Sequence, residues 1–372
     1  MISAPAQIGS HVSEVDTPAL LIELDALERN IRRMQERIAG TRLRLRPHAK
    51  THKSTAIANM QLAAGAVGVC CQKVSEAEIL VDGGIGDVLI SNEVIGTAKL
   101  DRVAALARRA KVAVCVDDLE NAEQLAAAAG KFGARIDVLV ELNVGANRCG
   151  VETAAEAVRL AAAIARAKSL RFAGLQAYHG AAQHLRAYGD RRRAIERAAG
   201  KVSDAVGLLR RNGLACGIVS GAGTGSFEFE IESGVYDELQ VGSYVFMDAD
   251  YGRNQDRDGA PVSEFENSLF LLTTVMSTPA AERAIVDAGL KALSVDSGMP
   301  LVAGCDGVSY AGASDEHGRL DVGGNQGFKL GEKIRLVPGH CDPTVNLHDW
   351  FVGIRNGHVE AVWPVSARGA VF

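Results

Sequence analysis

Between residue 16 and about residue 225 the chain repeats one unit, in which a short run of β-branched residues leads through a turn into an alanine-rich helical segment. The candidate strands cover residues 19–24, 43–50, 67–73, 87–92, 112–117, 137–144, 172–179 and 217–221. Strands that alternate with helices pair in parallel, because each helix carries the chain back to the same end of the sheet. About eight such units in roughly 210 residues predict a closed (β/α)8 TIM barrel better than an open sheet.

The pattern changes after residue 242, where short strand-like runs are joined by turns and helical periodicity almost disappears. Asn356-Gly357 lies between two such runs, and this dipeptide is typical of a two-residue β-hairpin turn. We therefore expect an α/β chain of two domains. Residues 16–254 would form the barrel, and residues 255–372, together with about 1–15, would form a mostly β domain.

Composition excludes several kinds of function. The chain has 372 residues, of which 47% are hydrophobic and 23% charged, so a sizeable core is available. A net charge of −5 and only 5% aromatic residues argue against a nucleic-acid surface. No apolar run reaches the ~20 residues that span a membrane, and residues 1–15 lack the pattern of a secretory signal. The seven cysteines are scattered without a CxxC pair, which favours a reducing, cytoplasmic setting.

The octapeptide at residues 46–53, Arg-Pro-His-Ala-Lys-Thr-His-Lys, ends the second candidate strand. Barrels place their chemistry at the C-terminal ends of strands, so Lys50 is our candidate for a Schiff-base lysine. Such an amine needs burial or neighbouring positive charge to be nucleophilic near neutral pH. The basic neighbours that would supply this charge are Arg46, His48, His52 and Lys53. The alternative interpretation is a solvated basic loop.

Two further strand ends carry polar groups. Residues 143–150 contain two glycines that bracket Arg148, whose guanidinium suits a phenolic or carboxylate oxygen. Residues 176–184 contain Tyr178 and His184, which are candidate proton-handling groups. The alternatives are a turn with a solvated arginine, a packed tyrosine and a surface histidine.

Residues 220–226 combine three glycines with hydroxyl residues after a strand, which is typical of a backbone-amide nest for a phosphate. The lysine of a GxxxxGK[ST] loop is missing, and residues 227–234 do not show the helix that a dinucleotide site requires. A compact phosphate monoester is therefore the better prediction, and Gly242-Ser243-Tyr244 adds further donors. A barrel with a strand-end lysine, an arginine and a phosphate nest describes a site for pyridoxal 5'-phosphate (PLP).

The last polar cluster lies at residues 338–349, where His340 and Asp342 are two positions apart. In an extended segment they project to the same side, with Cys341 on the other side. An imidazole and a carboxylate with room for water suit Mn²⁺, Mg²⁺ or a similar divalent cation. The alternative is a proline-bounded loop with incidental polar groups.

A series of segments along nearly the whole chain resembles one family, in the family's order: RPHAKTHK, GVCCQKVSEAE, ISNEV, NRCGV, LQAYHG, SGAGTGS, ELQVGSYVFMDADYG, VDAGLKALSVDSG, VPGHCDPTVNLHDW and PVSARG. This is the D-threonine aldolase and D-serine dehydratase-like family of fold-type III PLP enzymes. The resemblance implies an alanine-racemase-like barrel followed by a β domain. It also implies a homodimer, with each active site between one subunit's barrel and the other's β domain.

The resemblance also implies which residues bind the cofactor. Lys50 matches the PLP lysine, and Arg148 matches the arginine beside the cofactor's phenolic oxygen. Gln240 falls where racemases of this fold type carry an arginine that faces the pyridine nitrogen. The other positions that match cofactor contacts are His48, Gln72, Tyr178, Thr224, Gly225, Gly242, Ser243 and Tyr244.

His340 and Asp342 match the family's metal pair. The D-serine dehydratase branch reads His-x-Cys there and binds zinc, whereas the aldolases and the hydroxyaspartate dehydratase carry aspartate. The resemblance thus implies an aldehyde-lyase, dependent on PLP and on Mn²⁺ or Mg²⁺, that acts on D-3-hydroxy amino acids. Its products would be glycine and glyoxylate from 3-hydroxy-D-aspartate, or glycine and acetaldehyde from D-threonine. The base would be either metal-bound hydroxide or His184, with Tyr178 as a further catalytic group. Arg253 would bind a second substrate carboxylate, and the alternative is a surface arginine after a turn.

Three other functions stay open at this point. A dehydratase of D-threo-3-hydroxyaspartate or D-serine would use the same fold for β-elimination to a keto acid and ammonia. A non-catalytic PLP carrier is built on an isolated barrel, and the expected β domain argues against it. A PLP-independent phosphate-binding barrel enzyme would lack the yellow colour of a PLP protein.

Overall fold

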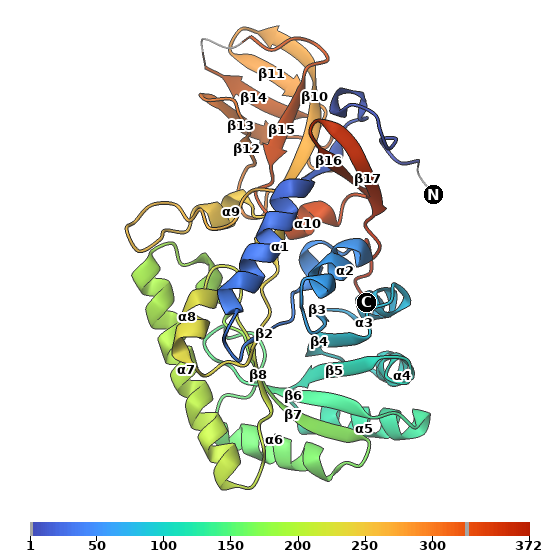
Figure 1. Cartoon of the computed structure of the whole chain (residues 1–372), viewed down its shortest axis with the longest axis vertical. Coiled ribbons are helices and arrows are strands. Elements are labelled where there is room, and N and C mark those ends of the chain that lie inside the picture. The colour runs from blue at the N-terminus through green and yellow to red at the C-terminus, as the bar shows by residue number, and fades with distance from the viewer. Residues whose placement is uncertain (1–2, 324–326) are drawn as a thin grey trace.

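The computed structural model describes residues 3–323 and 327–372, which form a parallel barrel and a second, mostly antiparallel sheet (Figure 1). The barrel strands follow the order β2-β9-β8-β7-β6-β5-β4-β3, and all neighbours pair in parallel. A parallel bridge between His48 and Cys70 closes the barrel, where the Cys70 N–H donates to Pro47 O at 2.8 Å. The predicted TIM barrel is therefore confirmed. Its strands are β2 (Arg44–Leu45), β3 (Val69–Cys71), β4 (Asp87–Glu93), β5 (Lys111–Val116), β6 (Ile136–Glu141), β7 (Leu170–Ala177), β8 (Ile218–Gly221) and β9 (Glu238–Leu239).

Helices cover the outside of the barrel, and three of them begin at a side-chain cap. Ser54, Asp118 and Thr153 each accept a backbone N–H of the first turn, which satisfies a donor that the helix leaves unpaired. Aliphatic residues of strands and helices form the main core between the two layers. The helices are α2 (Thr55–Ala63), α3 (Val74–Asp82), α4 (Thr97–Leu106), α5 (Leu119–Phe132), α6 (Ala154–Arg166), α7 (Tyr188–Arg211) and α8 (Phe227–Ser233).

The second sheet has the order β13-β14-β11-β10-β1-β16-β17, and β15 joins β10 and β12 at its side. Asn356 and Gly357 have φ values of 50° and 77°, as a two-residue hairpin requires, so the hairpin predicted between β16 and β17 is confirmed. The strands are β1 (Ala19–Glu23), β10 (Leu269–Ala280), β11 (Arg283–Val286), β12 (Leu301–Val302), β13 (Val308–Ala313), β14 (Gly318–Val322), β15 (Lys333–Val337), β16 (Trp350–Arg355) and β17 (His358–Pro364).

Two expectations from the sequence are wrong. Residues 19–24 were expected to form a barrel strand, but β1 pairs with β10 and β16 in the second sheet. A strand followed by a helix, here α1 (Leu24–Ile38), looks the same along the chain whichever sheet it joins. The eighth barrel strand is instead β9, which is too short to give a hydrophobic pattern. Residues 227–233 form α8, which was also not expected.

The remaining elements lie where the two sheets meet. The short helix α10 (Cys341–Val345) packs against the 3₁₀ turn Ala49–Thr51, and α9 (Ala249–Gly252) lies beside the turn Gly180–His184. After β17 the chain returns to the barrel and ends close to α2 and α3 (Figure 1). Further 3₁₀ turns cover Val12–Glu14 and Ser243–Val245. Within the described parts of the chain, none of the helices has the length and apolar character needed to cross a membrane.

Candidate active site

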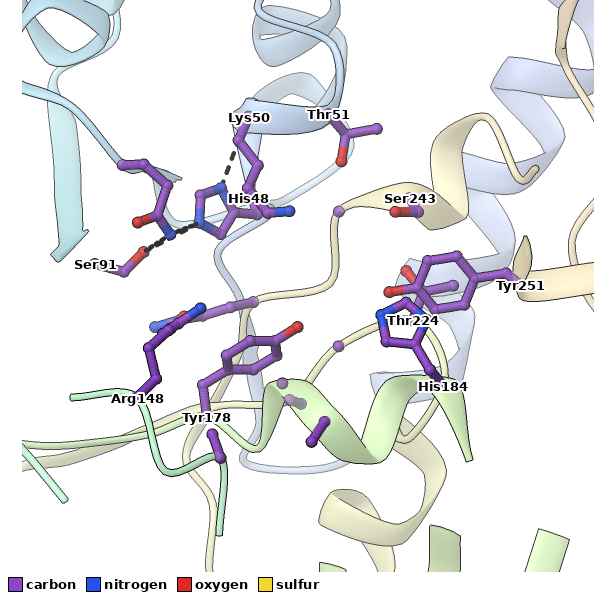
Figure 2. A pocket seen from close by; sticks show the side chains of 18 of the residues that line it. His48, Lys50, Thr51, Ser91, Arg148, Tyr178, His184, Thr224, Ser243 and Tyr251 are labelled. Carbon is purple, nitrogen blue, oxygen red and sulfur yellow. Dashed lines mark hydrogen bonds between the residues drawn. The ribbon is translucent and has the colours of Figure 1, made fainter. Parts of the chain in front are cut away.

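A cavity of about 360 Å³ lies at the C-terminal ends of the barrel strands, with α10 on one side. Figure 2 shows its side chains converging from several barrel loops. The predicted site residues that line it are His48, Lys50, Gln72, Arg148, Tyr178, His184, Thr224, Gln240, Gly242, Ser243 and His340. Most residues chosen from strand ends thus meet in one place, as the barrel geometry requires.

Lys50 contacts the short helix α10, which packs against its turn. Its Nζ lies 2.6 Å from Asp342 Oδ2, and its side chain is 39% exposed. The Asp342 carboxylate is the main cause that raises the pKa of Lys50, against the opposing effect of burial. Lys50 and His340 in turn lower the pKa of Asp342 to about 2, although burial alone would raise it. Lys50 is therefore a charged ammonium in this arrangement.

The basic neighbours of Lys50 do not activate it, contrary to the expectation from the sequence. Arg46 is buried between Glu238 and Asp87, with N–O distances of 2.9 and 2.7 Å. Lys53 pairs with Glu76. Burial lowers the pKa of His52 to about 4 and that of His48 well below its usual value, so both imidazoles are neutral near pH 7. The sequence shows only the run of basic residues. It does not show the carboxylates with which Arg46 and Lys53 pair in the fold.

His48 is held in place beside Lys50 by hydrogen bonds on both ring nitrogens. The Lys50 N–H donates to Nδ1 at 3.3 Å, and the Gln72 amide nitrogen lies 2.9 Å from Nε2 (Figure 2). Ser91 Oγ lies 3.1 Å from the same Nε2. The ring is thus a fixed, neutral surface on one side of the cavity.

Arg148 and Tyr178 lie on the side of the cavity opposite His48 (Figure 2). The Arg148 guanidinium lies 5.9 Å from the centre of the Tyr178 ring, a cation–π arrangement. Burial is the main cause that raises the pKa of Tyr178, so its phenol keeps its proton. No carboxylate of residues 3–323 or 327–372 forms an ion pair with Arg148, which leaves its charge available to a ligand.

The glycine-rich loop presents fewer donors than the sequence suggested. The Gly225 N–H donates to Gln183 Oε1 at 2.9 Å, and the Tyr244 N–H donates to Thr224 Oγ1 at 3.0 Å. Tyr244 is fully buried, and its hydroxyl accepts a hydrogen bond from Gln61. Gly225 and Tyr244 are therefore placed behind the cavity wall.

Thr224, Gly242 and Ser243 line the cavity, and their backbone N–H groups donate to no acceptor among the described residues. A Cβ at position 242 would lie 2.8 Å from Thr51 Oγ1, so only glycine allows this close approach. Free backbone amides beside a cavity are the donors that a phosphate group needs. The structure therefore fits a phosphate ligand bound by Thr224, Gly242 and Ser243, and not by Gly225, whose N–H already donates to Gln183.

Gln240 closes the floor of the cavity. Its Nε2 donates to Gln176 Oε1 and to Ser220 Oγ, both at 2.7 Å, and the Gln176 amide donates back to Gln240 Oε1 at 3.0 Å. Ser220 Oγ donates to Glu238, the partner of Arg46. This network fixes the neutral amide of Gln240 at the cavity.

His340 and Asp342 lie together, but not in the extended segment that was expected. His340 is the residue before α10, and Asp342 lies within its first turn. His340 Nε2 is 4.0 Å from Asp342 Oδ1, which is buried and has no hydrogen-bond partner. Asp296 Oδ2 lies 2.8 Å from His340 Nδ1 and so turns Nε2 toward Asp342. An orphaned carboxylate oxygen beside an oriented imidazole fits a divalent cation.

The other two members of this region behave differently. Cys341 Sγ is buried and contacts Met247 O at 3.4 Å, so it faces away from His340, as expected. Arg253 does not line the cavity: its guanidinium pairs with Asp250 and donates to Ser297 O at 2.6 Å. Asp296 was missed in the sequence, because its role depends on a contact across 44 positions.

His184 is paired with a carboxylate that the sequence did not point to. Its Nδ1 lies 2.6 Å from Asp250 Oδ2, and half of its side chain is exposed. Asp250 also binds the guanidinium groups of Arg186 and Arg253. The ring stands beside Tyr251 at the cavity, with Nε2 free of hydrogen bonds to described residues (Figure 2).

A second group of potential ligand atoms comes from Glu93, Asp117 and Cys149, which lie within 4.8 Å of one another. Burial and Glu93 raise the pKa of Cys149 to about 11, so the thiol keeps its proton near pH 7 when no cation is bound. None of these three residues lines the cavity that contains Lys50, whereas His340 does, so the pair of His340 and Asp342 is the better candidate for a cation that acts at this cavity.

Comparison with known proteins agrees with this geometry. Residues 22–250 match the family "Alanine racemase, N-terminal domain", and residues 268–354 match "Putative serine dehydratase domain". The chain therefore belongs to the alanine racemase-like, fold-type III family of PLP-dependent enzymes. The family expected from the sequence segments is confirmed.

Relatives that match over nearly their full length show which members of the family this chain resembles. The chain is 53% identical to a 3-hydroxy-D-aspartate aldolase of Paracoccus denitrificans (strain Pd 1222) and 50% identical to a D-threonine aldolase of Arthrobacter sp; each match covers 98% of this chain, and 95% and 96% of the relatives. The crystal structure of D-threonine aldolase from Filomicrobium marinum superimposes with a TM-score of 0.97 at 53% identity, over 99% of this chain and 100% of that one. A D-threo-3-hydroxyaspartate dehydratase of Delftia sp. (strain HT23) is more distant, at 32% identity over 89% of this chain and 92% of the relative.

Proposed function

We propose that the protein is a PLP- and divalent-cation-dependent aldolase that cleaves D-3-hydroxy amino acids to glycine and an aldehyde. The observation that carries the proposal is that Lys50 and His340 line one cavity, with Asp342 in contact with Lys50 and beside His340. Relatives about half identical over their full length bear the names of two such aldolases.

The barrel residues fit PLP. In this proposal Lys50 carries the cofactor, and the free amides of Thr224, Gly242 and Ser243 bind its phosphate. Arg148 and Tyr178 lie at the side where the phenolic oxygen would be held. When bound, PLP supplies an electron sink for the carbanion that forms when a Cα bond of the amino acid breaks.

His340 Nε2 and Asp342 Oδ1 would hold the divalent cation. Their carboxylate and imidazole suit Mn²⁺ or Mg²⁺, and the cysteine beside them faces away, which removes the sulfur ligand that zinc prefers. A divalent cation supplies Lewis acidity, which lowers the pKa of a hydroxyl that it binds.

His184 is our candidate for the base that removes the substrate's 3-hydroxyl proton. Asp250 holds Nδ1 and therefore leaves Nε2 as the atom that accepts the proton at the cavity. Tyr178 keeps its own proton and can donate a hydrogen bond to the ligand. Breaking the Cα–Cβ bond then releases the aldehyde, and a proton delivered to Cα gives glycine.

Substrate choice depends on charge near Asp250. One carboxylate faces two guanidinium groups there, those of Arg186 and Arg253, which leaves local positive charge. We propose that Arg253 binds the second carboxylate of 3-hydroxy-D-aspartate, which D-threonine lacks. This requires the guanidinium to move from Asp250 and Ser297 toward the cavity.

The second candidate function is β-elimination, which the match of residues 268–354 to a serine dehydratase domain favours. Elimination would use the same lysine and cation but would break the C–O bond and yield a keto acid and ammonia. The higher identity to aldolases favours aldol cleavage.

A homodimer with shared active sites, a cytoplasmic location and a domain boundary near residue 254 stay predictions from the sequence. The decisive test is a product assay. Holoenzyme with Mn²⁺ is incubated with 3-hydroxy-D-aspartate and, separately, with D-threonine, and glycine, aldehyde and ammonia are measured together. Glycine and aldehyde in equal amounts without ammonia are expected. Ammonia with a keto acid would establish the dehydratase instead.

A further inference from the structure

Three positions beyond Lys50 the same turn carries a second lysine with a different environment. The Lys53 side chain is only 9% exposed, and its Nζ lies 2.6 Å from Glu76 Oε1. The same Nζ is 3.3 Å from Ala367 O and 3.5 Å from Ala370 O. Lys53 has a φ of 49°, in the left-handed region, which costs free energy unless surrounding contacts hold it.

Glu76 connects Lys53 to the neighbouring strand end. Its second oxygen, Oε2, accepts the backbone N–H groups of Gln72 at 2.9 Å and Lys73 at 3.0 Å. These bonds fix the chain where β3 leads into α3. Gln72 is the residue whose amide holds His48 at the cavity.

The contacts close into a ring. From Lys53 they lead through Glu76 and Gln72 to His48, whose Nδ1 accepts the Lys50 N–H. The turn itself completes the ring, since the Lys53 N–H donates to Ala49 O at 2.7 Å. Two strand ends that both line the cavity are thus held by one buried ion pair.

The second sheet is attached to the same ring. The Ala367 N–H donates to Lys53 O at 2.9 Å, and residue 367 lies three positions after the end of β17. Figure 1 shows the chain returning from β17 to the barrel beside α2 and α3. Lys53 therefore receives contacts from the barrel through Glu76 and from the second domain through residues 367 and 370.

We propose that Lys53 and Glu76 are positioning residues for Lys50, and that residues 367–370 attach the second sheet to the Lys50 turn through Lys53. The inference rests on the proposed function only in taking Lys50 as the lysine that carries PLP. Buried ion pairs add little net stability compared with well-packed apolar residues, so a pair that orders two strand ends has its main effect on geometry.

The test compares holoenzyme variants by PLP affinity, visible spectrum and kinetics. Lys53→Met and Glu76→Gln are expected to weaken PLP binding at least tenfold and to shift the pH midpoint of the lysine-bound cofactor's absorbance. kcat should fall more than KM rises, and Lys53→Arg should restore part of each property. The matched control is Glu78→Gln in the same helix, because Glu78 pairs with Arg102 at 2.5 Å outside the ring. It should leave all of these properties unchanged.

Wild-type PLP affinity and pH midpoint in both variants, with only a lower melting temperature, would overturn the positioning role. If Lys53→Met does not fold, PLP affinity and the pH midpoint are measured in Glu76→Gln and Lys53→Arg. Wild-type values in Glu76→Gln would then overturn the positioning role. If the wild-type protein binds no PLP at Lys50, the proposed function is contradicted instead. Hydrogen exchange then tests the ring alone: faster exchange of residues 46–53 and 70–73 together in Glu76→Gln supports it, and unchanged exchange overturns it.

Discussion

The cavity has a barrel wall, formed by Lys50, Arg148 and Tyr178, and a cation wall, formed by His340 with Asp342 beside it. The barrel wall offers an amine, a guanidinium and a phenol, which suit a flat, anionic cofactor. The cation wall offers an imidazole and an unpartnered carboxylate oxygen, which suit a divalent cation. The 2.6 Å contact between Lys50 and Asp342 joins the two walls. In the proposed function, cofactor binding and hydroxyl activation would therefore come from different parts of the fold, so that each could be removed without the other.

The largest effect is expected from the barrel wall. Lys50→Ala removes the amine that carries PLP and should lower activity by at least ~10³-fold. The visible absorbance of the lysine-bound cofactor should disappear, as measured after dialysis of the holoenzyme. An unchanged spectrum in this variant would mean that Lys50 is not the cofactor lysine.

His184 lines the same cavity, and its replacement tests proton transfer separately from PLP and Mn²⁺ binding. His184→Gln should lower kcat by ~10²–10⁴-fold, because no other group held at this position can take the hydroxyl proton. PLP absorbance and Mn²⁺ affinity should stay at wild-type values. His358→Gln, an exposed position on β17, is the control. Equal kcat in both variants would remove His184 from the mechanism.

Arg253 tests whether charge beside the cation wall selects the substrate. Arg253→Ala should lower kcat/KM for 3-hydroxy-D-aspartate by roughly tenfold and leave that for D-threonine nearly unchanged, since only the former has a second carboxylate. The control is Arg257→Ala, which removes an exposed guanidinium that contacts Tyr188. A parallel loss on both substrates would assign Arg253 a structural role through Asp250.

The smallest effect on activity is expected from Glu230→Gln, a change of a buried residue of α8 that affects stability instead. Glu230 is fully buried, and burial raises its pKa to about 8. The folded state therefore binds a proton that the unfolded state releases above about pH 4.5, so stability falls as pH rises toward 8. Glu230→Gln should lack this loss, which amounts to roughly 2 kcal/mol between pH 6 and 8. Thermal melts at both values measure it, and parallel curves for the two proteins would contradict the assignment.

The sequence located the barrel wall well, because the residues at the ends of parallel strands converge by geometry alone. That rule alone was enough to predict that Lys50, Arg148 and Tyr178 lie near one another. The cation wall was also located, although its backbone is a helix start and not an extended segment. The prediction of this site depended on the residue types and on the family resemblance, so it did not fail when the expected extended segment proved to be wrong.

Contacts between distant parts of the chain could not be predicted. Asp296 and Asp250 act through His340 and His184, and no pattern in one sequence marks a carboxylate as another residue's partner. The basic run around Lys50 was misread for the same reason, since Asp87 of β4 pairs with Arg46 and Glu76 of α3 pairs with Lys53. β1 was assigned to the wrong sheet because its partners, β10 and β16, follow hundreds of positions later.

The most direct test of the division between the two walls measures PLP absorbance and Mn²⁺ binding side by side in Lys50→Ala and His340→Ala. His340→Ala should keep the visible absorbance of the holoenzyme but lose tight Mn²⁺ binding and Mn²⁺-dependent glycine release. Lys50→Ala should lose the absorbance and still bind Mn²⁺. Loss of both properties together in either variant would contradict the account, because the two walls would then form one inseparable site.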